Sequence, residues 1–110
     1  MSGKNSFSQP AVAGGFVPKG QTVSTYSPTV FGCKCIVNGG VGIFFVTLDE
    51  PIEDGRYVVV ATAVNPGEIT TAQLDSAPTA DQFEILTLDD TDTQIDSGVM
   101  FAVFAIPKTH

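Results

Sequence analysis

The amino-acid sequence predicts an all-β protein: an antiparallel β-sandwich or jelly-roll-like knob with an extended N-terminal arm. Six short runs rich in Val, Ile, Phe and Thr follow one another from residue 31 onward. Clusters of Gly, Pro, Asn and Asp separate these runs, and no convincing helix is visible between them. Short strands spaced by strong turn signals are typical of antiparallel sandwiches and barrels. With 110 residues, the chain has room for one such domain.

The expected strands are residues 31–37, 41–48, 57–64, 69–74, 83–88 and 99–106. The sequence Asn38-Gly39-Gly40 predicts a hairpin turn with positive φ at its glycines. Asn65-Pro66-Gly67 predicts the turn that ends the strand at residues 57–64. The acidic segment 89–98 leads into the last strand.

Residues 1–30 are predicted to form an extended arm, and residues 31–110 are predicted to form the β-sandwich knob. The arm is rich in Ser, Gly, Pro, Thr and Gln and shows neither helical nor alternating spacing. Five apolar residues along it are candidate contacts to a partner: Phe7, Val12, Phe16, Val17 and Tyr26. A leader without such contacts is the alternative interpretation. We expect that residues 1–20 can be deleted while the knob stays a folded oligomer.

Residues 57–64 and 99–106 carry apolar side chains on both faces of the expected strands. An antiparallel sheet with one face in water should instead alternate apolar with polar residues. Leaving a second apolar face in water would forgo several kcal/mol and promote aggregation. A self-associated state, most simply a cyclic oligomer, would cover this face. A thick monomeric core that covers both sides of the central strands is the alternative.

Charge excludes some partners. The formal net charge of −7 argues against a nucleic-acid binder, which needs clustered Lys and Arg. The sequence contains no apolar run of about 18 residues, so no membrane span is expected. The N-terminus lacks the continuous apolar segment of a signal peptide. All twelve acidic residues lie in residues 33–110, whereas residues 1–32 hold only Lys4 and Lys19 as charged residues.

The two cysteines stand one residue apart, at Cys33 and Cys35. In an extended strand their Cα atoms would lie about 6.6 Å apart with parallel side chains, at the edge of disulfide geometry. A structural zinc site needs four ligands, and the chain offers two Cys and one His, His110. Alternation places four residues on one face, opposite Lys34: Phe31, Cys33, Cys35 and Val37. Small buried apolar residues are the favoured interpretation, and a disulfide or metal site between subunits is the alternative.

The sequence favours neither an enzyme nor a cofactor. It has no serine elbow, phosphate-binding loop or helix-borne His pair, and His110 at the end of the chain is a weak candidate for a general base. The acidic segment offers Asp90, Asp92 and Asp96 as weak candidates for a Ca²⁺ or Mg²⁺ site. It lacks the glycine and the distal glutamate of an EF-hand, so a solvated hairpin tip is the favoured interpretation.

Three segments, GVGIFFVTLDEPIEDGRYVVVATAV, DQFEILTLDDTD and VMFAVFAI, carry a resemblance. They resemble the small trimeric β-sandwich modules of bacteriophage virion appendages, which are capsid decoration or cement proteins and head or tail fibre knobs. The resemblance covers residues 31–106. It rests on these positions: Gly40, Gly42, Phe44, Val46, Leu48, Pro51, Tyr57, Val59, Ala61, Thr62, Ala63, Phe83, Ile85, Thr87, Phe101, Val103 and Phe104.

The matched positions are apolar or turn residues, so the resemblance implies a fold and no functional residue. Members of the group are typically homotrimers. A fibre tip is expected to follow a shaft with heptads or repeats, which this chain lacks. The resemblance therefore implies a non-enzymatic capsid decoration or cement protein that binds the capsid shell as a homotrimer through its arm.

The implied partners are the chain itself and the major capsid protein or another virion protein. The implied place is the virion, at the capsid surface or a tail fibre, after synthesis in the host cytoplasm. The first alternative is a receptor-binding knob of a tail fibre that recognises host surface glycan through residues 65–68, 75–81 or 89–98. The second is a small cytosolic adaptor that depends on a bound cation.

Overall fold

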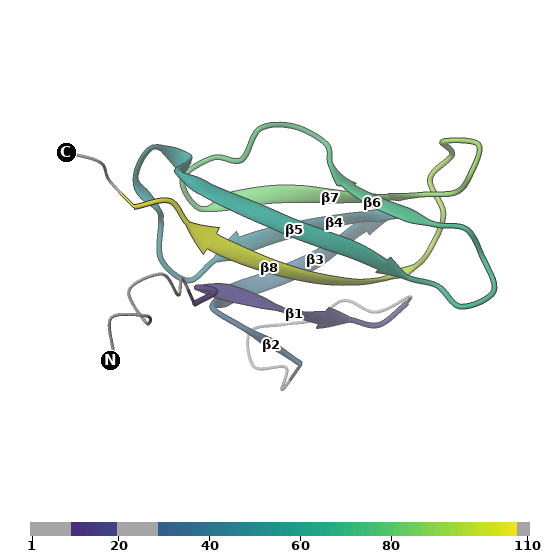
Figure 1. Ribbon diagram of the computed structural model, residues 1–110, viewed down its shortest axis with the longest axis horizontal. Coiled ribbons are helices and arrows are strands. Elements are labelled where there is room, and N and C mark those ends of the chain that lie inside the picture. Colours follow the sequence, from purple (N-terminus) through teal and green to yellow (C-terminus); the bar gives the residue numbers. More distant parts are fainter. Residues whose placement is uncertain (1–9, 20–28, 108–110) are drawn as a thin grey trace, which may run out of the picture.

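The computed structural model of the chain describes residues 10–19 and 29–107. Two four-stranded antiparallel sheets pack against each other as a β-sandwich (Figure 1). Sheet A has the order β2 (Val30–Phe31), β1 (Ala13–Val17), β8 (Gly98–Ala105) and β5 (Tyr57–Val64). Sheet B has the order β3 (Cys33–Gly40), β4 (Ile43–Leu48), β7 (Gln82–Leu88) and β6 (Thr71–Leu74). The predicted all-β sandwich is confirmed.

Most predicted strands coincide closely with observed ones, and residues 57–64 match β5 without change. The predicted strand at residues 31–37 is the exception, because the chain passes there from sheet A to sheet B. Gly32 makes this passage with a φ of +76°, and a Cβ at that position would collide with the carbonyl oxygen of Val12. The amide of Asp49 donates to the Gly32 carbonyl oxygen at 2.9 Å, which ties the passage to the end of β4.

β1 lies within the predicted arm and is a strand of the sandwich. It pairs with β8 from Ala13 to Val17 and with the short β2 on its other side. Ala13 and Val17 are 0% exposed in the core. The prediction of an extended arm outside the knob over residues 1–30 is therefore wrong for residues 13–17, which form a strand of the sandwich. Gly14 and Gly15 interrupt the alternation that would have marked this strand, because they have no side chain to show it.

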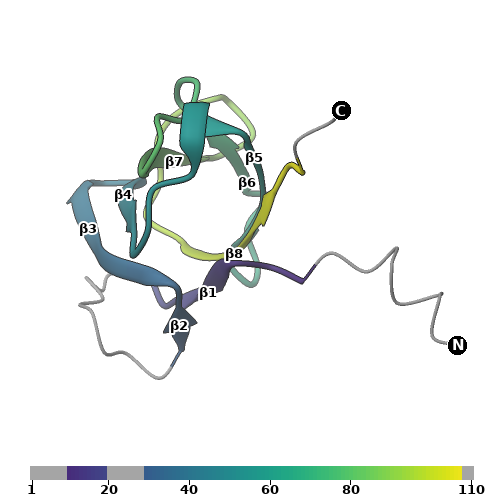
Figure 2. The ribbon, with the colours of Figure 1, turned by 90° about the vertical axis from the view of Figure 1, so that its left-hand side faces the viewer.

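The core residues come from both sheets and lie between them. Figure 2 shows the two sheets end-on. The ring of Phe83 on β7 lies 6.0 Å from the rings of Tyr57 and Phe101 on sheet A, in tilted and edge-to-face arrangements. Aromatic pairs of this geometry contribute about 0.5–1.5 kcal/mol beyond the burial of their area. The fully buried core residues are Ala13, Val17, Ile36, Phe44, Val46, Leu48, Ile85, Val99 and Val103.

The Tyr57 hydroxyl joins this core to the loop after β6. It donates to the carbonyl oxygens of Thr79 at 2.8 Å and Gln82 at 3.2 Å. Burial, and then the negative charge of Asp81, raise the pKa of Tyr57 to about 12. The neutral hydroxyl is therefore part of the packed state, because tyrosinate could not donate to either oxygen.

The β3–β4 turn consists of Val41 and Gly42, directly after the predicted Asn38-Gly39-Gly40, because β3 continues to Gly40. Gly42 has a φ of +73°, and a Cβ there would lie 2.7 Å from the Thr87 carbonyl oxygen and 2.8 Å from that of Ile95. Thr87 donates its amide to the Gly42 carbonyl oxygen at 2.9 Å and its hydroxyl to the Ile95 carbonyl oxygen at 2.7 Å. This turn thus packs closely on β7 and on the loop before β8.

Gly42→Ala should destabilise the protein more than Gly67→Ala. Both glycines have positive φ, but nothing lies within 4 Å of a Cβ at Gly67. Left-handed backbone costs a Cβ-bearing residue about 1–2 kcal/mol, so Gly67→Ala should lose about that amount of unfolding free energy. Gly42→Ala should lose at least about 1 kcal/mol more, because backbone oxygens of two elements must move. Urea unfolding measures both, and equal losses would contradict the packing at Gly42.

Tyr57→Phe should lower the unfolding free energy at neutral pH by about 1–2 kcal/mol, because two partly buried hydrogen bonds lose their donor. Since the pKa of Tyr57 in the folded protein is about 12, above its ordinary value of 10.0, its stabilisation is complete below pH 10 and declines as the pH rises toward 12. The difference between the two proteins in urea unfolding should therefore shrink above pH 10. A difference that stays constant up to pH 11 would contradict the buried neutral hydroxyl.

Candidate functional site

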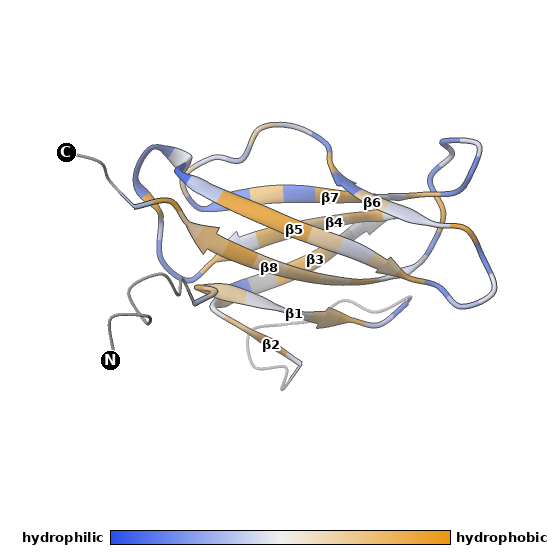
Figure 3. Cartoon of the chain, in the orientation of Figure 1, coloured by the Kyte–Doolittle hydropathy of each residue, from blue (hydrophilic) through white to orange (hydrophobic). Residues whose placement is uncertain are grey.

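The outer face of sheet A, the side turned away from sheet B, is the most extensive apolar surface that the described residues form. Its members are Val12, Phe16, Phe31, Val58, Val60, Met100, Ala102, Phe104 and Ile106. In the register of the sheet, Val60, Ala102, Gly14 and Phe31 form one row across four strands. Figure 3 shows the apolar colour along the middle of β5 and most of β8.

The side chains of this face stand half in water. Val60 is 57% exposed, Phe31 53% and Met100 49%. The predicted second apolar face on these strands is confirmed. Within residues 10–19 and 29–107 the alternative of a monomeric core that covers both sides of these strands is wrong, because this part of the chain leaves one side open. Phe31 lies over Gly14, with its Cε1 3.5 Å from where a Gly14 Cβ would lie, so the face continues across β1.

The outer face of sheet B is different in chemistry. Val37 and Phe45 are exposed there, but Phe45 stands opposite Glu84 in the register. Beside this pair the Gln82 side-chain amide donates to the Thr47 hydroxyl at 3.3 Å. By contrast, the four strands of sheet A contain no Asp, Glu, Lys or Arg. Among the described strands, a continuous uncharged surface therefore belongs to sheet A.

A second candidate surface is a pocket of about 370 Å³ at one end of the sandwich. It lies where the entry to β1, the passage at Gly32 and the loop after β4 meet. Its lining residues are Val12, Gly32, Leu48, Asp49, Glu50, Pro51 and Ile52. The pocket combines apolar walls with two exposed carboxylates, so it fits an apolar side chain that has a basic group beside it.

The five predicted contact residues of the arm have separate environments. Val12 lines the pocket and lies at the margin of the outer face of sheet A. Phe16 is half-buried on that face, and Val17 lies in the core of its own chain. Phe7 and Tyr26 lie outside the described residues. The structure therefore brings Val12 and Phe16 to the surface and removes Val17 from the candidate contacts.

Cys33 is buried in the core, and its thiol donates to the carbonyl oxygen of Phe31 at 3.6 Å. The predicted role of a small buried apolar residue is confirmed for Cys33. The predicted common face is wrong for Phe31, Cys33 and Val37, and the side chain of Cys35 lies outside the described ones. Gly32 separates Phe31 from β3, and the register of β3 shifts between Cys33 and Cys35. The core side of β3 carries Cys33 and Ile36, whereas Val37 is exposed.

Asp89 organises the acidic loop. Its Oδ1 accepts from the Thr91 amide at 2.8 Å, the Thr91 hydroxyl at 2.7 Å and the Thr93 amide at 3.0 Å. These hydrogen bonds, first that of the Thr91 hydroxyl, lower the pKa of Asp89. The loop thus holds its shape through its own side chains, as aspartate turns commonly do.

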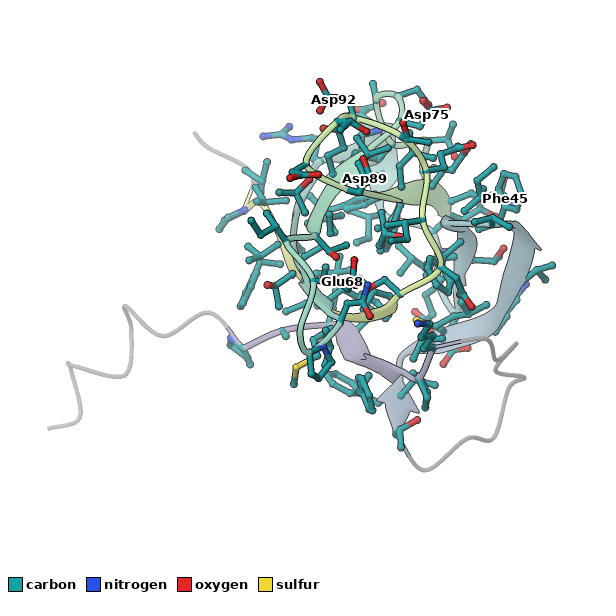
Figure 4. All side chains as sticks on the ribbon, turned by 90° about the vertical axis from the view of Figure 1, so that its right-hand side faces the viewer. Phe45, Glu68, Asp75, Asp89 and Asp92 are labelled. Atoms are coloured by element: carbon teal, nitrogen blue, oxygen red, sulfur yellow. The ribbon has the colours of Figure 1, made fainter. Side chains whose placement is uncertain are left out.

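The three predicted cation ligands are arranged loosely. Asp90 and Asp92 are exposed, whereas Asp96 is partly buried and its Oδ1 has no hydrogen-bond partner. Figure 4 looks onto this end of the molecule and labels Asp89, Asp92 and Glu68. Within residues 10–19 and 29–107, no three His, Cys, Asp or Glu side chains gather closely enough to hold a metal ion. His110 lies beyond these ranges.

A smaller hollow of about 130 Å³ lies beside the loop between β6 and β7. Its lining includes Phe45, Ser76, Gln82 and Glu84. Burial, then the charge of Asp75 and a side-chain hydrogen bond with it, raise the pKa of Glu84. The hydroxyl, amide and carboxyl groups of this lining can hydrogen-bond a small polar ligand. The aromatic edge of Phe45 can contact the apolar part of the same ligand.

Comparison of the chain with models of protein families, with curated proteins and with solved structures found no match. Among the described residues, no helix has the length and apolar character needed to cross a membrane.

Proposed function

We propose that the chain is a non-enzymatic structural protein of a bacteriophage virion, a decoration or cement protein that binds the capsid shell as a homotrimer. The observation that carries this proposal is the uncharged apolar outer face of sheet A. Large exposed apolar surfaces mark interaction sites, because a protein that works alone in water loses stability and solubility by keeping them. The resemblance of residues 31–106 to virion modules supports a bacteriophage virion as the assembly that the chain joins.

The capsid contact is proposed at the end of the sandwich where the N-terminal segment enters β1. Val12 lies there at a pocket of about 370 Å³, beside the carboxylates of Asp49 and Glu50. An apolar side chain can enter such a pocket while a basic group pairs with its rim, a combination that gives both affinity and orientation. Residues 10–12 lead to this end, so the capsid-binding role predicted for the arm is kept as a proposal for residues 1–12.

The test is co-sedimentation of the purified protein with capsids of the same phage. Deletion of residues 1–20 is unsuitable because it removes β1, so the truncation should stop at residue 9. We expect the full chain to pellet with capsids, and the chain without residues 1–9 to stay in the supernatant while it keeps a cooperative melting transition.

A matched pair of substitutions separates the proposed contact from general surface charge. Val12→Asp should weaken capsid binding at least tenfold, whereas Ile69→Asp, at a remote residue that is 71% exposed, should leave it unchanged. Equal binding by the full chain, the truncated chain and both variants would contradict the contact at Val12. A full chain that never binds capsids would contradict the decoration role.

A receptor-binding knob of a tail fibre is the second proposed function, and the hollow of about 130 Å³ favours it. The hollow borders residues 75–81, one of the segments expected to recognise a glycan. Sugar hydroxyls suit the amide of Gln82 and the carboxyl of Glu84, and the Phe45 ring offers an apolar edge. A glycan array should then give a hit that Gln82→Ala removes, and an array without any hit would contradict this function.

A further inference from the structure

The outer face of sheet A is large enough for a protein interface. Six of its side chains are about half exposed: Val12, Phe31, Val58, Val60, Met100 and Ile106. At about 150–200 Å² for a whole side chain of this size, they present on the order of 500 Å² of apolar surface. Two such faces in contact would remove about 1,000 Å² or more from water, which reaches the lower bound for a specific interface.

The chemistry of the face restricts its occupant. The chain has a formal net charge of −7, yet the strands of sheet A carry no charged residue. A basic or acidic partner surface would lose hydration here without finding an opposite charge. The occupant must therefore be apolar over an area of similar size.

The chain's own segments outside the described residues supply too little apolar surface. Residues 1–9 contain Met1 and Phe7 as their large apolar side chains, and residues 20–28 contain Val23 and Tyr26. Neither set matches the nine apolar residues of the face. A second copy of the chain does match it, because it presents the same residues on a sheet of the same twist.

We infer that the outer face of sheet A packs against the same face of a second copy of this chain. Around the threefold axis of the proposed homotrimer this face of each copy meets the faces of its two neighbours, so each copy supplies the row from Val60 to Phe31. This inference deepens the proposed function, since it names the surface through which copies would associate before or during binding to the capsid.

The experiment measures mass in solution by light scattering over a concentration series, for three forms of the full chain. These are the wild type, Val60→Lys on the outer face of sheet A, and Val37→Lys on the outer face of sheet B. Both valines are exposed strand residues, 57% and 46%, and both substitutions bring the net charge closer to zero. General electrostatic repulsion between copies therefore falls equally in the two variants.

The wild type should have a mass above the 11.5 kDa of one chain. Val60→Lys should raise the dissociation constant at least about tenfold, because an ammonium group would enter an apolar contact without a partner. Val37→Lys should associate like the wild type. Far-UV circular dichroism and thermal melting check that each variant is folded.

A wild type of single-chain mass at the highest soluble concentration would overturn the inference. An unchanged dissociation constant for Val60→Lys, or an equal rise for Val37→Lys, would overturn it as well. The proposed function is tested separately, because co-sedimentation measures binding to capsids and not the mass of the protein in solution. An oligomer that resists Val60→Lys and still binds capsids would refute the contact surface and leave the decoration role intact.

Discussion

The structure depends on β8, because its two sides take part in two different contacts. One side carries Val99, Phe101 and Val103 into the core against sheet B. The hydrogen-bonding edges of β8 are both used, by β1 on one side and β5 on the other. Its remaining side, with Met100 and Phe104, is apolar and faces outward. A strand with two apolar sides requires two layers of cover, and the described residues of one chain provide a single layer.

This constraint explains the distribution of charge. Acidic residues lie in the turns and loops around the strands, such as Asp49 and Glu50 after β4 and Asp89 to Asp92 before β8. These carboxylates keep the ends of the sandwich hydrated. They leave the broad side of sheet A uncharged, so the molecule separates a solvated part of its surface from a part suited to apolar contact.

Much of the fold could be predicted from the sequence, because strand and turn signals are local. β5 was predicted without error, since Gly55 precedes it and Asn65-Pro66-Gly67 ends it. The apolar outer side of β5 and β8 was visible as a missing alternation. β1 was not predicted, because Gly14 and Gly15 carry no pattern and the strand is defined by its pairing with β8 near the other end of the chain.

The candidate surfaces depend even more on long-range geometry. The register shift between Cys33 and Cys35 moves residues from one side of β3 to the other. No residue type at these positions predicts this shift. The pocket at Val12 is built from three segments that are distant in sequence. No short stretch of the sequence could therefore predict its volume or its carboxylate rim. The hydrogen bonds of Asp89 with Thr91 and Thr93, by contrast, belong to one short segment and fit the predicted solvated tip, although the segment links β7 of sheet B to β8 of sheet A and not two paired strands.

Methionine oxidation tests the central claim, that the outer face of sheet A is covered in solution, most directly. Met100 lies in the middle of this face and is 49% exposed in a single chain. Dilute peroxide converts exposed methionine to the sulfoxide, and peptide mass spectrometry gives the rate at Met100. We predict that Met100 oxidises slowly in the concentrated wild type and several-fold faster in Val60→Lys. A fast rate in both proteins, independent of concentration, would contradict the account.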